Sequence, residues 1–367
     1  MYSRPTGPPP GNFQQGQYTR PSAPPPNRDA YPLPQQQQQG QGQYSMQTVQ
    51  IQGTNRTQQF ALSNCSGRKK ALLIGINYIG TSNQLRGCIN DVNAMFNFLT
   101  SVGGYLANDI VLLTDNNNQP SHLPTRDNIL RAMSWLVNGA QPGDSLFFHY
   151  SGHGGQEKDL NGDEISGYDE CIYPVDFKSA GSIIDDIMHD IMVKPLPAGC
   201  RLTGIFDSCH SGTALDLPFT YRAQDGGLKE YNILKDSAGD GLNILMGYMN
   251  GNSRMMLSGA KSIFGKVTNY KSDSKIQQIQ QSKMSPADVI TFSGCRDDQT
   301  SADANEAGTF TGALSWAFLT VMSQTRGQGL SYLTLLQSIR SVMAQKYTQK
   351  PQLSSSHQIN PNTAFFF

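Results

Sequence analysis

The chain has 367 residues, with 28 basic and 28 acidic side chains and therefore a formal net charge of zero. It has no dense basic stripe with interleaved aromatic residues, which argues against a nucleic-acid partner. No apolar run approaches the roughly 18 residues that a membrane span requires. Six cysteines, none in a CxxC pair, favour reduced thiols over a disulfide framework, so we expect a cytoplasmic protein, with the nucleus as an alternative.

Residues 1–67 are expected to form a disordered leader. Residues 1–60 contain half of the 20 prolines of the chain and 15 glutamines, but only five charged side chains. A segment this poor in large aliphatic residues cannot bury enough surface to offset its conformational entropy. A solvated tail is the simpler interpretation, and a segment that docks or aggregates is the alternative.

Beyond the leader, short apolar runs alternate with segments of helical periodicity. Strands are predicted at 70–76, 109–113, 145–150, 171–175, 201–206 and 289–294, and helices at 91–99, 125–137, 310–323 and 331–347. This alternation predicts an α/β fold, a mostly parallel central sheet flanked by helices, over residues 68–367. Residues 222–286 interrupt it with glycine pairs and scattered lysines, and we expect a flexible loop there.

Two polar segments that follow predicted strands suggest cysteine-based catalysis. Cys209 follows the apolar run at 201–206, and His153 follows the run at 145–150, 56 positions earlier (209 minus 153). Ligands of parallel α/β folds bind beyond the carboxyl ends of the strands, so both residues are expected at one edge of the sheet. A thiol needs a neighbouring imidazole to become a nucleophilic thiolate and to protonate the leaving amine.

Four separated motifs carry a family resemblance. They are GCIND at 87–91, HYSGHGG at 149–155, IYPVD at 172–176 and DSCHSG at 207–212. In order and spacing they resemble a type I metacaspase of the fungal kind, a caspase-like cysteine peptidase, and the leader resembles the prodomain of that type. True caspases instead carry Q-A-C-x-G around the cysteine.

The resemblance implies a caspase-haemoglobinase fold with cleavage after Arg or Lys. It makes Cys209 the nucleophile and His153 the general acid and base, and it assigns the oxyanion hole to the backbone amides of Gly154 and Cys209. No third triad member is evident. It further implies a monomer, with a large-subunit-like part at 68–221 and a small-subunit-like part at 287–367.

The resemblance also places four residues in the S1 pocket: Cys88, Asp91, Ser151 and Asp207. Two carboxylates in a partly desolvated pocket favour a guanidinium or an ammonium group and disfavour an aspartate side chain. On sequence alone, each aspartate would more often be a helix cap or a surface residue.

Acidic residues suggest a metal site. The segment from Asp159 to Glu170 imitates an EF-hand loop, but Glu164 stands at its sixth position, where glycine is required, so a solvated acidic loop is expected. The resemblance instead implies an activating Ca²⁺ bound by Asp169, Asp185, Asp186 and Asp216, whose oxygens suit a hard cation.

A lysine-bearing loop beside such a site invites self-cleavage of a zymogen. Lys283 is the favoured position, with Lys271 and Lys275 as alternatives. We therefore expect a Ca²⁺-activated endopeptidase that acts on proteins at Arg or Lys, with roles in regulated cell death and protein quality control. The alternative is a scaffold whose Gln/Pro-rich leader binds protein aggregates or chaperones.

Overall fold

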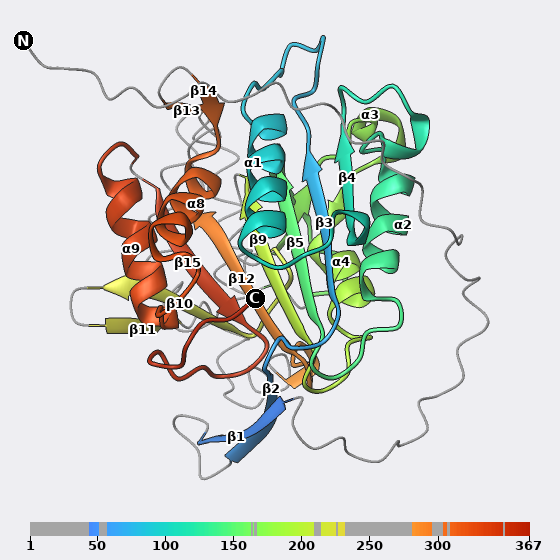
Figure 1. Cartoon of the computed structure of the whole chain (residues 1–367). Coiled ribbons are helices and arrows are strands. Elements are labelled where there is room, and N and C mark those ends of the chain that lie inside the picture. Colours follow the sequence, from blue (N-terminus) through green and yellow to red (C-terminus); the bar gives the residue numbers. More distant parts are fainter. Residues whose placement is uncertain are drawn as a thin grey trace, which may run out of the picture.

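The computed structural model describes residues 44–50, 57–162, 164, 167–208, 214–224, 227–231, 281–295, 304–306, 309–347 and 349–367. Its centre is an eight-stranded sheet in the order β11-β10-β15-β12-β9-β5-β3-β4 (Figure 1). Five neighbouring strands are parallel: β12 (Asp288–Cys295), β9 (Arg201–Asp207), β5 (Ser145–Ser151), β3 (Lys69–Gly75) and β4 (Ile110–Thr114). The remaining three are antiparallel: β15 (Lys350–Ser355), β10 (Phe219–Gln224) and β11 (Gly227–Tyr231).

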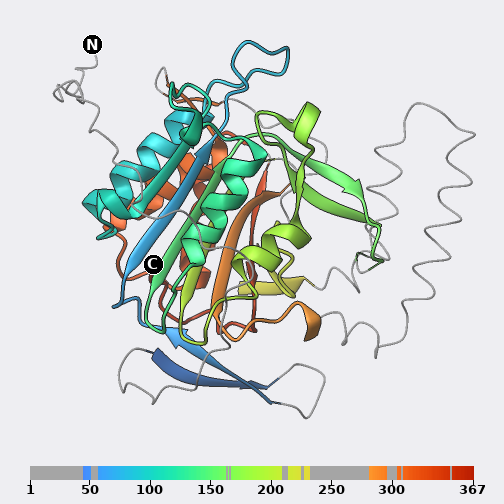
Figure 2. The same ribbon diagram turned by 90° about the vertical axis from the view of Figure 1, so that its right-hand side faces the viewer.

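Helices cover both faces of this sheet (Figures 1 and 2). One face packs against α1 (Cys88–Ser101), α8 (Ala313–Thr325) and α9 (Tyr332–Ala344), and the other against α2 (Arg126–Val137) and α4 (Asp185–Met192). Successive residues of β3 alternate between the two cores, since Ala71 and Leu73 join the first and Leu72 and Ile74 the second. Strands buried on both faces read as continuous apolar runs, and the predicted α/β fold with a mostly parallel sheet is confirmed.

Smaller elements complete the described part of the chain. They are a three-stranded sheet of β6 (Gly154–Lys158), β7 (Tyr168–Ile172) and β8 (Ile183–Ile184), the hairpin of β13 (Ala304–Glu306) and β14 (Thr309–Thr311), helix α3 (Phe177–Ala180), and 3₁₀ turns at Ala107–Asp109 and Pro120–His122. Thr125 caps α2 as predicted, because its side chain accepts a hydrogen bond from the amide of Asn128. Among the helices described, none is long and apolar enough to cross a membrane.

The expected disorder of residues 1–67 is wrong where the structure describes this segment. Strands β1 (Tyr44–Gln50) and β2 (Thr57–Ser63) form an antiparallel hairpin, and β2 packs its end against the sheet. Phe60 is buried and stacks on His357 at 3.7 Å between ring centroids, and the Ser63 amide donates to Asp288. Two buried residues of β2, Phe60 and Ala61, thus anchor the hairpin, which the average composition of the leader conceals.

The loop expected at 222–286 is likewise too long. It overlaps β10 and contains β11, which extend the sheet at its antiparallel edge through β15. Its last residues, 281–286, are also described, and Lys283 and Ser285 are buried there. The central part, residues 232–280, lies outside the described residues, and so do Lys271 and Lys275.

A buried ion pair joins the first residues of β9 and β12. The Arg201 guanidinium donates two hydrogen bonds to Asp288, at 2.9 and 2.6 Å, and another to the Tyr332 hydroxyl. His357 contacts the second oxygen of the same carboxylate at 3.0 Å. Because Asp288 has several donors, chiefly Arg201, its pKa lies below its ordinary value despite complete burial.

Candidate active site

The carboxyl ends of β5 and β9 place the two predicted catalytic segments side by side. The strands are parallel neighbours, and Ser151 at the end of β5 is paired with Asp207 at the end of β9. His153 comes two residues after Ser151, and Cys209 comes two residues after Asp207 in the sequence. Cys209 lies outside the described residues, as do 210–213, so its assignment as the nucleophile stays a prediction.

The His153 ring is oriented by a backbone carbonyl. Its Nε2 lies 2.8 Å from the carbonyl oxygen of Asn83. A carbonyl only accepts hydrogen bonds, so Nε2 carries the proton, and in the neutral ring Nδ1 is the nitrogen that can take a proton from a thiol. The carbonyl of Asn83 thus orients the ring in the way that a third triad member would in the predicted dyad. A backbone group leaves no signal in a sequence, which is why none was evident.

Two tyrosines fix the backbone of His153. Its amide donates to the Tyr78 hydroxyl at 3.0 Å, and its carbonyl accepts from the Tyr150 hydroxyl at 2.6 Å. The Tyr78 ring also lies 4.6 Å from the His153 ring, between centroids. Burial, and to a smaller extent neighbouring groups that include the Cys88 thiol, raise the pKa of Tyr78, so its phenol is neutral. Cys88, predicted in the S1 pocket, is buried at the start of α1 and belongs to the same core cluster as Tyr78.

Gly154, the predicted oxyanion donor, opens β6 and is paired with Ile172 of β7. The next residue could not carry a side chain, because a Cβ on Gly155 would lie 2.4 Å from the Tyr173 hydroxyl oxygen. This pairing fixes the strand that leads away from His153. The role of the Gly154 amide remains a prediction.

Asp91 is buried among three donors. The Ser151 hydroxyl donates to one oxygen at 2.6 Å and the Thr311 hydroxyl to the other at 2.5 Å, while the Gly312 amide lies 2.9 and 3.0 Å from the two oxygens. Burial, followed by the charge of Asp207, raises the pKa of Asp91 to about 7. The structure therefore brings together Asp91, Ser151 and Asp207 from the predicted pocket.

The N-terminus of α8 holds both carboxylates. The Ser315 amide donates to Asp207 at 2.7 Å, and a Cβ placed on Gly312 would lie 2.2 Å from one oxygen of Asp207 and 2.9 Å from one of Asp91. The free amides of a helix N-terminus carry partial positive charge and stabilise anions. Sequence analysis missed this contribution from residues 311–315, because it joins segments more than 100 residues apart.

A second acidic cluster contains the predicted metal ligands. Asp185 opens α4 and accepts a hydrogen bond from the Glu170 amide at 3.1 Å. Burial and then the charges of Glu170, Asp216 and Glu164 raise the pKa of Asp185 to about 10. Carboxylates that repel one another in this way have the oxygen chemistry that Ca²⁺ prefers.

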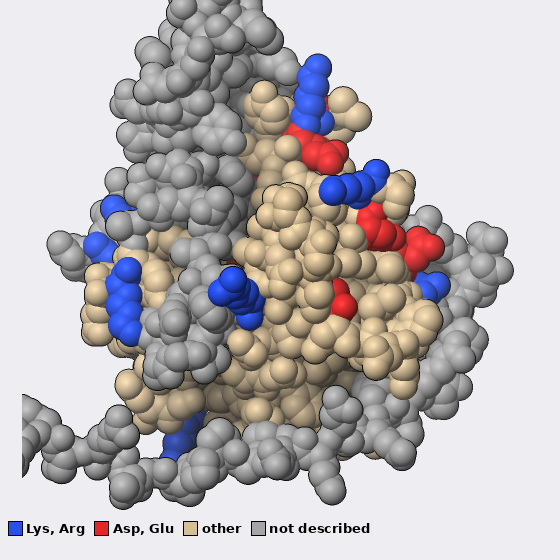
Figure 3. All heavy atoms as spheres, turned by 90° about the horizontal axis from the view of Figure 1, so that it is seen from above, with Lys and Arg blue, Asp and Glu red and all other residues tan. Residues whose placement is uncertain are grey.

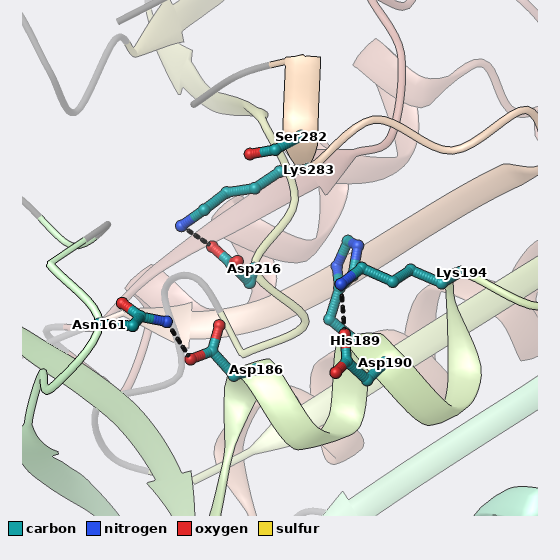
Figure 4. A pocket seen from close by; sticks show the side chains of 8 residues that line it. All are labelled: Asn161, Asp186, His189, Asp190, Lys194, Asp216, Ser282 and Lys283. Carbon is teal, nitrogen blue, oxygen red and sulfur yellow. Dashed lines mark hydrogen bonds and ion pairs between the residues drawn. The ribbon is translucent and has the colours of Figure 1, made fainter. Parts of the chain in front are cut away.

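The other predicted ligands lie around this cluster. Asp186 accepts from the Asn161 amide group at 2.8 Å and lines a pocket of about 230 Å³ together with Asp216 (Figure 4). Asp169 is buried in β7. Within the described part of the chain, no three His, Cys, Asp or Glu side chains converge as a ready metal site. A cation is nevertheless present, because the Lys283 ammonium contacts Asp216 at 2.5 Å.

Two further predictions need correction here. Lys283 was expected on a flexible processing loop, but it is buried in ion pairs with Asp216 and Glu164. Asp159 was expected in a solvated loop, but it is buried and accepts the amides of Gly162 and Glu164. In both cases a carboxylate binds a nearby donor group, and composition alone does not reveal this contact.

The described surface at this edge of the sheet is sparsely charged. Figure 3, which views the molecule from above Figure 1, shows basic and acidic side chains in small groups among uncharged residues. Four of the cysteines, Cys65, Cys88, Cys171 and Cys200, are buried and form no disulfide bonds with one another.

Comparison with known proteins agrees with this geometry. The family model for a metacaspase, peptidase C14 domain matches residues 69–218. Metacaspase-1 of Debaryomyces hansenii is 57% identical over 313 residues, covering 85% of this chain and 70% of that protein. Metacaspase-1 of Kluyveromyces lactis is 54% identical over 333 residues, with 90% and 76% covered, and that of Saccharomyces cerevisiae is 52% identical over 371 residues, with 99% and 84% covered.

The fold and these relatives define the class of the protein, which is a caspase-like cysteine peptidase. The chain belongs to the metacaspase family, as its four motifs indicated.

Proposed function

We propose that this peptidase is a Ca²⁺-activated endopeptidase that cleaves protein substrates after Arg or Lys. The observation that supports this specificity is the buried pair of Asp91 and Asp207. Asp207 ends β9, which lies beside β5, and His153 follows the end of β5. A guanidinium or ammonium group entering beside two carboxylates gains charge-assisted hydrogen bonds, whereas an aspartate side chain is repelled.

The proposed reaction uses His153 twice. Its Nδ1 takes the proton of the Cys209 thiol, and the thiolate attacks the carbonyl carbon of the scissile bond. The amides of Gly154 and Cys209 hold the oxyanion that develops. The imidazolium then gives its proton to the leaving amine as the carbon–nitrogen bond breaks, and water hydrolyses the thioester. The Asn83 carbonyl keeps the ring in the required tautomer throughout.

Asp185, Asp186, Asp216 and Asp169 are the residues that would hold Ca²⁺. Bound there, the ion would supply positive charge that lets neighbouring carboxylates approach one another. Asp216 follows Cys209 by seven residues (216 minus 209), so Ca²⁺ bound by Asp216 would act on the segment that carries the proposed nucleophile.

The test is hydrolysis of paired fluorogenic peptides that end in Arg or Asp, with and without millimolar Ca²⁺. Ca²⁺-dependent release after Arg alone, and its complete loss in Cys209→Ala, is expected. Activity retained by Cys209→Ala would refute the nucleophile, and equal release after Asp would refute the acidic pocket.

Roles in regulated cell death and protein quality control are proposed on family grounds, and self-processing of a monomeric zymogen accompanies them. The scaffold alternative assigns aggregate binding to the leader. Deletion of residues 1–43 separates these possibilities, because it spares the anchored hairpin of β1 and β2. Peptidase activity is expected to survive, while recruitment to aggregates is lost if the leader is the targeting segment.

A further inference from the structure

The Lys283 ammonium group forms ion pairs with Asp216 and Glu164, and the three residues come from separate segments of the chain. Its Nζ lies 2.5 Å from Asp216 Oδ1 and 2.8 Å from Glu164 Oε1 (Figure 4 shows the first pair). The lysine side chain is 10% exposed, and its two partners are 8% and 17% exposed. Glu164 comes from the connection between β6 and β7, Asp216 from the segment after β9, and Lys283 from the residues just before β12.

More carboxyl groups gather around this ion pair than the two that the Lys283 ammonium contacts. The charges of Glu170, Asp216 and Glu164 all act on Asp185. Carboxyl oxygens gathered in this way are the ligands that a hard divalent cation prefers. The pocket of about 230 Å³ beside the ion pair gives an ion access from solvent.

The residues after Lys283 are anchored. Met284 packs against the core, and the Ser285 hydroxyl donates to the Val193 carbonyl at 3.3 Å. The preceding residues, 281 and 282, are exposed. The Lys283–Met284 bond therefore lies where an exposed segment meets the folded core, and Asp216 holds the lysine side chain at that point.

The ion pair and cleavage at Lys283 exclude each other. A protease that cuts after lysine must take the ammonium group into its own acidic pocket, and one ammonium cannot be at Asp216 and in that pocket at once. Cleavage at this bond therefore requires that Lys283 first break its ion pairs with Asp216 and Glu164.

We propose that Lys283 is an internal counter-ion of the Asp216 and Glu164 site, and that a divalent cation binding there displaces it and exposes the Lys283–Met284 bond to cleavage. The cleaving enzyme rests on the proposed function, whereas the displacement does not. Ca²⁺ then acts on the substrate bond as well as on the enzyme, and self-processing is held back until the ion arrives.

Lysine labelling tests the displacement without catalysis. Full-length Cys209→Ala protein is treated with an amine-reactive acetyl ester, with and without Ca²⁺, and acetylation is quantified by mass spectrometry. Lys283 is expected to react slowly without Ca²⁺ and about tenfold faster with it, since reaction follows the displaced fraction. Lys350, which is exposed on β15, is the control and should react equally in both conditions. Equal labelling of Lys283 with and without Ca²⁺ would overturn the proposal.

Competition gives a second, independent measurement. In the Cys209→Ala background, Lys283→Met removes the internal cation, so calorimetric Ca²⁺ affinity should rise by about tenfold, while Lys350→Met leaves it unchanged. Unchanged affinity in Lys283→Met overturns the displacement, and so does weaker binding.

The two proposals fail separately. If Ca²⁺ releases Lys283 but the wild type does not cut after Arg, the displacement stands and the proposed specificity falls. If the wild type cuts after Arg and Lys283 stays protected in Ca²⁺, the specificity stands and the displacement falls.

Discussion

The two buried acidic clusters of this molecule are neutralised in different ways. Asp91 and Asp207 are held by hydroxyl groups and by the amides at the start of α8. Asp216 and Glu164 are held by a full positive charge, the ammonium of Lys283. Both clusters combine burial with mutual repulsion, and in both the pKa of a carboxyl group is raised.

The difference decides what each cluster can do with an incoming cation. Dipoles stabilise an anion without cancelling its charge, so the Asp91 and Asp207 pair can receive a cationic side chain directly. An ammonium cancels the charge, so an ion that enters the Asp216 site must displace a resident group. In the functions proposed above, the first cluster would bind a cationic side chain and the second would exchange Lys283 for a metal ion.

The largest expected effect comes from Asp207→Asn. Removing one buried charge of the Asp91 and Asp207 pair should lower kcat/KM for an Arg substrate on the order of 100-fold, because the neutral amide cannot form an ion pair with a guanidinium group. The control is Asp127→Asn, an exposed residue in the first turn of α2, which should leave kcat/KM unchanged. Steady-state kinetics at saturating Ca²⁺ measures this. An equal loss in both variants would mean that the effect does not come from the buried Asp91 and Asp207 pair.

Gly312→Ala tests whether α8 must approach the pair this closely. The new Cβ would lie 2.2 Å from an Asp207 oxygen, so the helix or the carboxylate must move. The free energy of unfolding should fall by roughly 1–3 kcal/mol, and cleavage after Arg should weaken. Gly294→Ala is the matched control, since its Cβ would meet its nearest atoms at 3.8 Å. Wild-type stability and kinetics in Gly312→Ala would contradict the close contact.

The pH dependence of cation binding should report on Asp91. Its pKa is raised to about 7, so its carboxyl group is neutral below that pH and charged above it. Benzamidine, an arginine-like cation, should bind Cys209→Ala protein more tightly as pH rises through about 7, on the order of tenfold per pH unit below it. Thr311→Val removes a donor to Asp91 and should move the midpoint upward. Calorimetry that finds pH-independent binding would refute this.

The smallest effect is expected from Asp190→Ala. Asp190 pairs with Lys194 one helical turn along α4, at 2.5 Å, but the two side chains are 61% and 58% exposed. Exposed pairs contribute little, so urea unfolding in EDTA should change by less than about 0.5 kcal/mol. A larger loss would mean that exposure does not separate this pair from the buried Lys283 pair.

Much of the fold follows from local sequence, because a strand buried on both faces must be a continuous apolar run. The apolar runs that form β3, β4, β5, β9 and β12 could be predicted in this way, and His153 could be placed after the end of β5. Strands β1, β2 and β11 are more polar and lie outside the parallel core, so composition predicted disorder or a loop there.

The partners within the site could not be predicted in the same way. Asp91 meets Gly312 across 221 positions of sequence, and Asp207 meets Ser315 across 108. Such contacts depend on how α8 packs against the sheet, which no local pattern encodes. The Asn83 carbonyl is a backbone group, and the burial of Lys283 depends on the position of Asp216.

The parallel pairing of β9 with β12 determines what a cut between β11 and β12, where the Lys283–Met284 bond lies, would leave behind. Six residue pairs join these strands, and the buried Arg201 and Asp288 pair closes their first residues. The halves of such a nicked chain would stay together as one particle, with Asp91 from one half still bound to Gly312 from the other. Processing would then be visible as two bands in a denaturing gel and invisible in the native mass.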